Sequence, residues 1–550
     1  MTADLSAFFD SYYRLRPVNA TFTGIHDHDD RLPDWSPVSL ESALDEMRAL
    51  RQSLAGAADP APASLHDVAA RDRALACAFL DIQIAEVDSR RFQRGNPSLA
   101  AGEAIFGVIG LMTRPFAPAL ARVEAAASRL AAIPAFLAGA RRSISGAIPL
   151  RWREKTIKEC EGADRLLEIG IPRWLKNEAT PAAAAGRALD AAREARAAFL
   201  DVRRWLESAP EGPEQYGCGA ELFDLLLARG HWSARRRSDL ASEASAALDE
   251  ALARLHEQAA SAGGWSAVQS RLAEVHPPAD AYLSTYQRLW DACRQRAIEL
   301  DLVTWPDYPI RYVPIPEHTR DAAPFLYYLF YRSPAPFDRL PIHDYVVTPV
   351  EPDMPADERE RRLRATNRSV MKLNHVVHHG AIGHHVQNYH AYHGESQIGR
   401  VAAVDCASRI GMFLGGSMAE GWACYATDLM EEAGFLTPDE QLAQQHARAR
   451  LLARAVVDIG LHEGSLGFEQ AVAVYRDRLG MPAEAAVGEA CKNSMFPGTA
   501  VMYWLGTDTL HQLRRDRSRA EGPAFSLRAF HDRVLAHGSI PVPLIAGLMA

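Results

Sequence analysis

The chain has 550 residues, with 60 Lys and Arg against 69 Asp and Glu, and 48% of its residues are hydrophobic. This composition excludes a disordered chain, which would be less apolar, and a nucleic-acid coat protein, which would be strongly basic. A chain of this length supplies roughly three to four domains' worth of residues and can bury a large core. We therefore expect a soluble globular protein.

Cysteine usage and the N-terminal residues bear on where the protein resides. None of the seven cysteines forms a Cys-x-x-Cys pair, which argues against a thiolate zinc site and a redox dithiol. The first 17 residues lack the basic start and apolar run of a secretory signal. Apolar stretches such as 104–112 end short of the roughly 20 residues that span a membrane. We expect a cytoplasmic protein that binds neither membranes nor nucleic acid, while its oligomeric state stays open.

The first part of the chain has the pattern of amphipathic helices. Apolar residues recur every three or four positions, with charged residues between them, over 120–133, 183–206 and 238–255. This spacing gives a helix one face that can be buried. We predict helices over these three ranges.

A segment of different character follows, from 303 to 358. It contains the best strand signals, over 310–315 and 344–350, and it is rich in proline and aromatic residues, Tyr327 among them. A loop-rich aromatic segment can form the wall of a small-molecule site. We predict a substrate-binding role for Tyr327 in such a wall.

Helical spacing returns in the last part of the chain. Helices are predicted over 364–392, with a break near Gly380 and Gly383, and over 402–434 and 441–460. The whole pattern predicts a mainly α fold with a small β element. We expect one continuous structure in two lobes around a cleft, a helical scaffold over 1–302 and a functional lobe over 303–550.

Histidines are concentrated in one part of the predicted helix over 364–392. Seven of the 20 lie between His375 and His393, where a uniform distribution would place fewer than one. Neutral imidazoles are common metal ligands, so this run predicts a metal-binding helix. His378 and His385 share a helix face but lie about 10.5 Å apart along a regular helix. One ion could bind both only if the helix were distorted, which Gly380 and Gly383 would allow.

A third ligand is needed to complete a site built on two histidines. Glu420 is the only acid between Asp405 and Asp428, in a largely apolar helical stretch. A carboxylate there would be costly to bury alone and reasonable as a metal ligand. Two histidines and one glutamate leave coordination positions open, which suits zinc hydrolysis or non-haem iron chemistry.

Two segments resemble the signature of the DUF885 family, which is metallopeptidase-like and related to the helical thermostable carboxypeptidases. That signature reads His-Glu-x-x-Pro-Gly-His-His-x-Gln, followed later by Glu-Gly-Trp-Ala-x-Tyr. Here His378 stands at the first His, Gly383 begins the Gly-His-His, and the second motif runs from Glu420 to Tyr425. The likeness covers nearly the whole chain and implies a gluzincin-like, two-lobed helical scaffold. It favours His384 as the second ligand, whereas regular helix geometry favours His385, and the choice stays open.

This chain departs from the signature at the residue that matters most for catalysis. His379 stands where the family has Glu, and Ile382 stands where it has Pro. In zinc peptidases with a His-Glu motif, that glutamate takes the proton from the metal-bound water. An imidazole can also accept a proton near neutral pH. We therefore interpret His379 as the replacement for the usual base.

Three further residues are candidates for roles around the metal. His462 lies four residues after Asp458 on a probable helix, so the acid could orient the imidazole for a catalytic role. Tyr503 could donate a hydrogen bond to an oxyanion, a role implied by the same resemblance. Arg454 could bind a substrate carboxylate through a bidentate fork.

The expected function is therefore that of a metal-dependent enzyme with one divalent ion. Zinc is the first choice, and iron and manganese are alternatives. The first hypothesis is hydrolysis of an amide or peptide-like bond in a small molecule or short peptide-like substrate. The alternatives are a non-hydrolytic enzyme, such as a lyase or oxygenase of a small metabolite, and a catalytically silent binding protein.

Overall fold

The structure is a computed structural model that describes residues 3–54, 61–89, 91–210, 212, 214–326, 334–351, 353–404 and 409–550. Helices make up 73% of the chain and strands 2%, which confirms the prediction of a mainly α fold. The chain divides into two compact units. Unit 1 comprises Met1–Tyr216, Ile315–Leu329 and Ala335–Leu340, and unit 2 comprises Gly217–Pro314, Phe330–Pro334 and Pro341–Ala550. The boundary expected after residue 302 thus falls inside unit 2.

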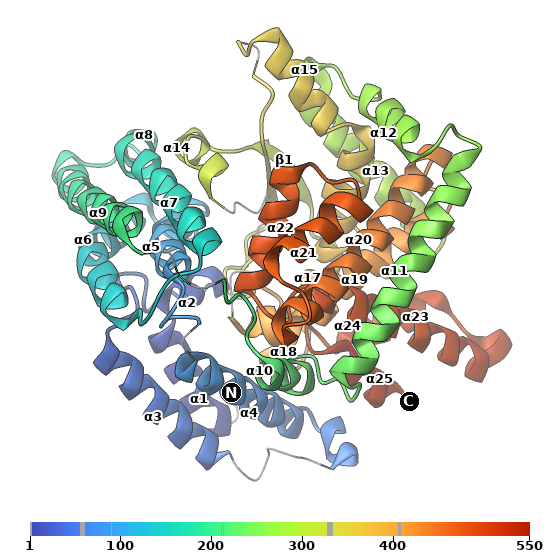
Figure 1. Ribbon diagram of the computed structural model, residues 1–550, viewed down its shortest axis with the longest axis horizontal. Helices are drawn as coiled ribbons and strands as arrows, with labels where there is room; N and C mark the ends of the chain where they lie inside the picture. Colours follow the sequence, from blue (N-terminus) through green and yellow to red (C-terminus); the bar gives the residue numbers. More distant parts are fainter. Residues whose placement is uncertain are drawn as a thin grey trace. The chain divides into compact units, whose positions relative to one another are not determined.

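Unit 1 is helical, and its helices are drawn mainly in blue and cyan in Figure 1. They are α1 (Ala3–Leu15), α2 (Pro17–Thr23), α3 (Pro37–Ser53), α4 (Val68–Asp88), α5 (Pro97–Met112), α6 (Ala119–Ser143), α7 (Leu150–Arg165), α8 (Ile171–Asn177), α9 (Ala182–Ser208) and the short α14 (Glu317–Arg320). The predicted helices over 120–133 and 183–206 are confirmed as α6 and α9.

The core of unit 1 forms where α5, α6, α7 and α9 pack together. Small residues on α9, such as Ala188 and Ala195, are fully buried and let the helices approach closely. Trp174 of α8 is fully buried in the same core. Burial of this apolar surface is the main stabilising contribution to the unit.

Unit 2 contains most of the remaining helices and the only two strands of the described residues. Its helices α10 to α13 and α15 to α17 are α10 (Ala220–Leu225), α11 (Arg237–Ala260), α12 (Trp265–Glu274), α13 (Tyr282–Glu299), α15 (Ala356–Ala365), α16 (Arg368–Val370) and α17 (His384–His393). The others are α18 (Gln397–Val401), α19 (Gly416–Glu432), α20 (Pro438–Glu463), α21 (Phe468–Ala473), α22 (Ala483–Met495), α23 (Val501–Glu521), α24 (Leu527–Ala536) and α25 (Val542–Met549).

The predicted elements of unit 2 are largely confirmed. The helices over 238–255 and 441–460 correspond to α11 and α20. The predicted helix over 402–434 corresponds to a π-helical turn, η8 (Gly411–Gly415), continued by α19, and it begins later than expected. Residues 405–408 lie outside the described part of the chain.

The small β element is a parallel pair of strands. Strands β1 (Ile310–Pro314) and β2 (His343–Val347) pair in register from Ile310 with His343 to Pro314 with Val347. The pairing places Tyr312 beside Tyr345, and both side chains are buried. The Tyr345 hydroxyl lies 2.7 Å from Nδ1 of His375, so the strand pair contacts the histidine-rich segment.

A buried polar network holds the helices of unit 2 around α19. The Asp428 carboxylate accepts hydrogen bonds from Gln444 and Arg448 of α20, both at 2.8 Å, and lies 2.9 Å from Nε2 of His511 of α23. Burial alone would raise the pKa of Asp428, but His511 and Arg448 lower it overall, so the carboxylate is ionised at neutral pH. One carboxylate thus links three helices.

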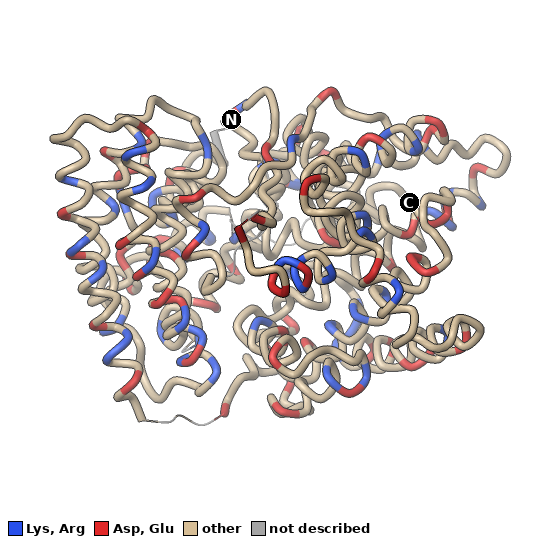
Figure 2. The backbone as a smooth tube through the Cα atoms, turned by 90° about the horizontal axis from the view of Figure 1, so that it is seen from above, with Lys and Arg blue, Asp and Glu red and all other residues tan. Residues whose placement is uncertain are grey.

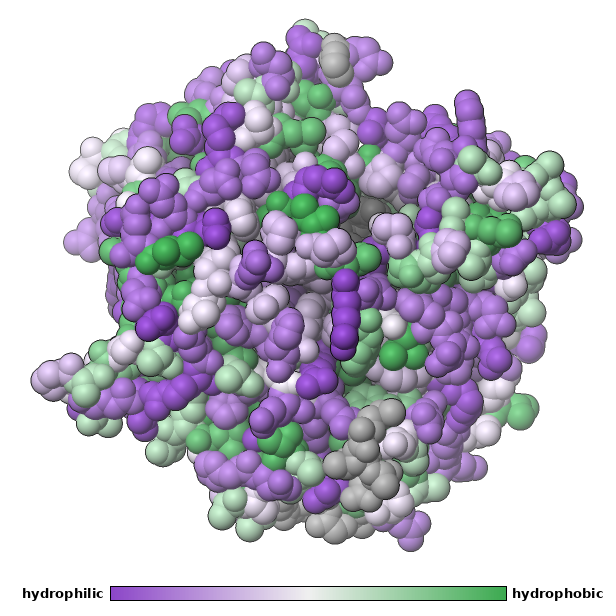
Figure 3. Space-filling model, turned by 180° about the vertical axis from the view of Figure 1, so that it is seen from behind, coloured by the Kyte–Doolittle hydropathy of each residue, from purple (hydrophilic) through white to green (hydrophobic). Residues whose placement is uncertain are grey.

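Charged residues of both signs are interspersed along the chain in Figure 2. The face drawn in Figure 3 is mostly hydrophilic, with hydrophobic residues in small scattered groups. One helix, α6, is long and apolar enough to cross a membrane by length and composition, and 50% of its apolar window is buried. Core helices of soluble proteins pass the same test, so this is weak support for a membrane span.

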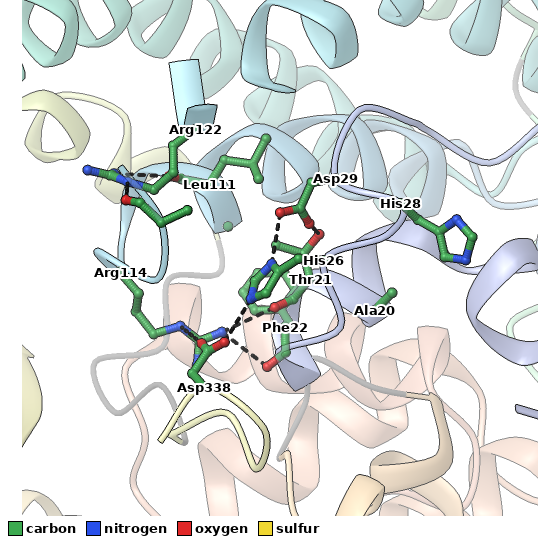
Figure 4. Close-up of polar contacts among 12 residues, drawn as sticks. Ala20, Thr21, Phe22, His26, His28, Asp29, Leu111, Arg114, Arg122 and Asp338 are labelled. Atoms are coloured by element: carbon green, nitrogen blue, oxygen red, sulfur yellow. Dashed lines mark hydrogen bonds and ion pairs between the residues drawn. The ribbon is translucent and has the colours of Figure 1, made fainter. Parts of the chain in front are cut away.

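In unit 1, a histidine between two carboxylates connects distant parts of the chain (Figure 4). His26 Nδ1 lies 2.8 Å from Oδ2 of Asp29, and its Nε2 lies 2.8 Å from Oδ1 of Asp338. Arg114 is 3.6 Å from the other oxygen of Asp338 and donates to the main-chain oxygen of Phe22. The His26 ring stacks on Phe116 at 3.9 Å. Burial alone would lower the pKa of His26, but the two carboxylates outweigh it and raise the pKa to about 9.

This pKa predicts how the stability of the protein depends on pH. Because the pKa in the folded state lies above the usual 6.5, the stabilisation is complete below about pH 6.5 and is lost as the pH rises through 9. We expect the free energy of unfolding to fall more steeply between pH 6.5 and 9.5 in the wild type than in His26→Gln. Urea unfolding at both pH values checks this, and equal slopes in the two proteins would contradict it.

Candidate metal centre

The histidine-rich segment is interrupted at the predicted position. A π-helical stretch, η7 (Met371–Gly380), is followed by a turn, and α17 begins at His384. The turn is closed by main-chain bonds from Ala381 N to Val376 O at 2.8 Å and from Gly383 N to Val377 O at 2.9 Å. Segments of π-helix recur at functional sites because they redirect side chains. Here the interruption brings the rings of His378 and His384 to within 4.9 Å, centroid to centroid.

Two tryptophans hold this turn in place. Trp422 of α19 donates to the carbonyl oxygen of Ile382 at 2.9 Å, and Trp290 of α13 donates to that of Gly380 at 2.7 Å. A side chain at Gly383 could not fit, because its Cβ would lie 1.9 Å from the main-chain oxygen of His378. The second motif therefore anchors the first through Trp422 as well as through Glu420.

Glu420 lies where the two imidazoles meet. Its Oε2 is 3.3 Å from Nε2 of His378 and 3.5 Å from Nε2 of His384, and its side chain is 5% exposed. Burial alone would raise the pKa of Glu420, but the adjacent His384 and His378 hold it well below its usual range. Two imidazole nitrogens and one buried carboxylate oxygen form a donor set that fits a divalent ion. Small shifts would let all three atoms contact such an ion.

Tyr503 also contacts this cluster. Its hydroxyl donates to Oε1 of Glu420 at 2.9 Å, which fixes the carboxylate and leaves Oε2 directed at the histidines. The contact depends on close packing of α19 and α23, since a Cβ at Gly421 would lie 2.6 Å from Cα of Gly506. Asp458 fixes the start of α23 by accepting hydrogen bonds from three main-chain amides, those of Gly498, Ala500 and Val501.

His379 lies beside the same two histidines. Its ring centroid is 4.6 Å from that of His378 and 5.2 Å from that of His384. Nδ1 lies 2.7 Å from the carbonyl oxygen of Asn374 and must donate to it, because a carbonyl only accepts. Burial, with the neighbouring His378 and His384, holds the pKa of His379 well below its usual value. Its imidazole is therefore neutral, with the lone pair on Nε2.

His385, the alternative ligand, is directed elsewhere. Its Nε2 donates to the carbonyl oxygen of Tyr308 at 2.8 Å, and its ring stacks on that of Tyr308 at 5.1 Å. The structure thus brings His384, and not His385, beside His378 and Glu420. A regular helix would favour His385, but the turn at 381–383 rotates α17 and reverses that preference.

The two other predicted residues that are described have partners within the protein. Arg454 forms a fork to Glu489, with both hydrogen bonds at 3.0 Å, and its guanidinium lies 4.7 Å from the centre of the Tyr503 ring. His462 is fully buried, accepts a hydrogen bond from Cys218 N at 3.1 Å and lies 2.9 Å from Asn493 O. The structure does not bring His462 into the histidine and glutamate cluster. Tyr327 lies outside the described residues.

Some contributors to the site could not be identified from the sequence. The Asn374 carbonyl that fixes His379 is a main-chain group, which no motif marks. Cys424 lies 4.0 Å from Nδ1 of His378, through Sγ. It falls inside the second motif, at its variable position, so its closeness to Glu420 in sequence was the only available signal.

The fold and this cluster define a mainly α-helical protein with a group of three histidines and one glutamate, of which His384 and Glu420 are buried and His378 and His379 partly buried. The family model described as "Bacterial protein of unknown function (DUF885)" matches residues 17–549. The chain therefore belongs to the DUF885 family, which confirms that part of the resemblance. None of the curated proteins matches it.

Two solved structures show the same fold. One is described as a "putative lipoprotein of unknown function" from Shewanella oneidensis, with 21% identity, a TM-score of 0.76 and coverage of 99% of this chain and 98% of the other. The second is a "putative lipoprotein" from Colwellia psychrerythraea, with 16% identity, a TM-score of 0.77 and coverage of 99% and 97%. At these identities the likeness concerns the fold alone.

The tight turn at Gly383 leads to a prediction about stability. In Gly383→Ala, the added Cβ would overlap the His378 main-chain oxygen, so the turn must shift, at a cost on the order of 3 kcal/mol. We expect a lower melting temperature than in the wild type. The matched control is Gly488→Ala in α22, where a Cβ meets nothing within 4 Å. Equal melting temperatures for the two variants would show that the turn is not fixed as described.

Proposed function

We propose that this protein is a metal-dependent enzyme whose single divalent ion is held by His378, His384 and Glu420. The observation that carries the proposal is the convergence of two imidazole nitrogens on one oxygen of a buried carboxylate, at 3.3 and 3.5 Å. A carboxylate with 5% exposure is costly to bury unless a positive charge compensates it. Zinc is the first choice, with iron and manganese as alternatives.

The first candidate reaction is hydrolysis of an amide or peptide-like bond in a small substrate. A bound divalent ion would polarise the carbonyl group of the substrate and lower the pKa of a water molecule. In the chain itself, Tyr503 holds Glu420 in place at 2.9 Å, which keeps the negative charge next to the ion site. His379 is neutral, and the lone pair on its Nε2 could accept the proton from water. This candidate also rests on the resemblance to helical metallopeptidases.

The second candidate is a non-hydrolytic reaction of a small metabolite at the same centre, by a lyase or an oxygenase. The observation that favours it is an imidazole at position 379, where the resemblance leads us to expect a glutamate base. The three rings of His378, His379 and His384 lie within 5.2 Å of one another, centroid to centroid. In hydrolysis His379 would accept a proton from water, whereas the second candidate does not require His379 to act as that base.

The cellular location and the partners stay predictions. The sequence predicts a cytoplasmic protein, whereas both solved neighbours are described with the word lipoprotein. Fractionation of the producing cells, with detection of the native protein in soluble and membrane fractions, separates the two locations. A small or short peptide-like substrate remains the expected partner.

The metal site itself is tested by stoichiometry. We expect one divalent ion per chain in the purified wild type, and a loss of affinity of at least roughly 100-fold in Glu420→Gln, which removes the negative charge that binds the ion. Elemental analysis and calorimetric titration with Zn²⁺ measure both. The control is Glu432→Gln on the same helix, where the glutamate pairs with Arg514 near the surface. No stoichiometric metal in the wild type would contradict the proposal and favour a silent binding protein.

The reaction is tested by restoring the expected base. In His379→Glu, a carboxylate would stand next to His378, as in the family signature. We expect hydrolysis of a panel of short peptides and amides by the zinc-loaded variant to exceed that of the wild type by at least roughly tenfold, because general-base catalysis contributes about 100-fold or more. An inactive variant that still binds zinc would argue against hydrolysis on this scaffold.

A further inference from the structure

The three imidazoles of the centre form a nearly equilateral group. The ring centroids are 4.6 Å apart for His378 and His379, 4.9 Å for His378 and His384, and 5.2 Å for His379 and His384. One nitrogen from each ring lies within 4.8 Å of the corresponding nitrogens of the other two. Nitrogens bound to one ion at about 2.1 Å lie at most roughly 4.2 Å apart, so movements of about an ångström would bring all three onto it.

The hydrogen bond of His379 determines which of its two ring nitrogens can bind an ion. Nδ1 donates to the carbonyl oxygen of Asn374, so Nε2 carries the lone pair. Metal-bound histidines are commonly oriented in this way, by a carbonyl or carboxylate that accepts from the second nitrogen. The acceptor is a main-chain atom of η7, the same segment that carries His378, so the two rings are held together.

From this geometry we infer that His379 is a fourth protein ligand of the ion, which completes a set of three imidazoles and one carboxylate. The ring of His379 lies 4.6 Å from that of His378 and 5.2 Å from that of His384, and these distances bracket the 4.9 Å between His378 and His384. The three rings therefore form one compact group, in which each is a neighbour of the other two. The inference rests on the proposed metal site, and it assigns His379 a role that replaces proton acceptance.

The fourth ligand changes which ions and substrates suit the centre. With four protein ligands, a tetrahedral zinc ion would have no position left for water, as in structural zinc sites. An ion that takes five or six ligands, such as iron(II) or manganese(II), would keep one or two positions for a substrate. The inference therefore favours a small molecule that binds the ion directly through oxygen atoms. It favours the non-hydrolytic candidate over hydrolysis.

The test counts the imidazoles on a bound ion. We would load the full-length wild type with Co²⁺ alone and measure X-ray absorption at the cobalt edge, together with calorimetric affinity. We expect three imidazoles in the wild type and two in His379→Gln, with affinity lowered at least roughly 100-fold, because loss of a bond to the ion should cost at least as much as the roughly 10- to 100-fold cost of losing a residue that only orients a ligand. The number of imidazoles bound to Co²⁺ in the wild type tests the inference by itself, even if the variant fails to fold.

The control is His393→Gln, in the same run of histidines. Its Nδ1 lies 2.7 Å from a main-chain oxygen, that of Tyr389, as Nδ1 of His379 lies 2.7 Å from that of Asn374. His393 is exposed at the end of α17, so its loss should leave the count at three. Two imidazoles in the wild type, or unchanged affinity in His379→Gln, would overturn the inference but leave the metal site standing. Failure of the wild type to bind Co²⁺ would overturn both.

Discussion

The centre of unit 2 depends on the burial of one negative charge, the Glu420 carboxylate, beside two imidazoles. A buried carboxylate without compensation is expensive, so the surrounding structure must supply positive charge or hydrogen bonds. Here Tyr503 donates to one oxygen and His378 and His384 face the other. This arrangement requires α19, α23 and the interrupted helix to meet at one point.

The interruption of the helix at 381–383 is what makes that meeting geometrically feasible. It is stabilised by two tryptophans that donate to main-chain oxygens, Trp422 to Ile382 and Trp290 to Gly380. Main-chain groups freed by a helix break must find new partners, and here these indole donors satisfy two of them. The second sequence motif thus supplies both an acidic residue of the centre and a support for the turn that presents His384.

Helix content, the position of the helix break and the pair of strands could be predicted from the sequence. These features follow from local signals, namely apolar spacing, glycine positions and β-branched or aromatic runs. The choice between His384 and His385 could not be predicted, because it depends on the rotation of α17 after the turn. The pairing of Arg454 with Glu489 could not be predicted either, because the two residues come from different helices, α20 and α22.

The sequence by itself determined that the chain is mainly helical, that its histidines are concentrated in one segment, and that Glu420 is a lone acid in an apolar stretch. It also identified His379 as the departure from the family signature. Only the tertiary structure decided which of these groups lie together, and that the ring of His379 lies within 5.2 Å of those of both His378 and His384. Composition and periodicity report the neighbours of each residue along its own helix, whereas this cluster depends on the turn that brings His384 back to His378 and on the packing of α19 that adds Glu420.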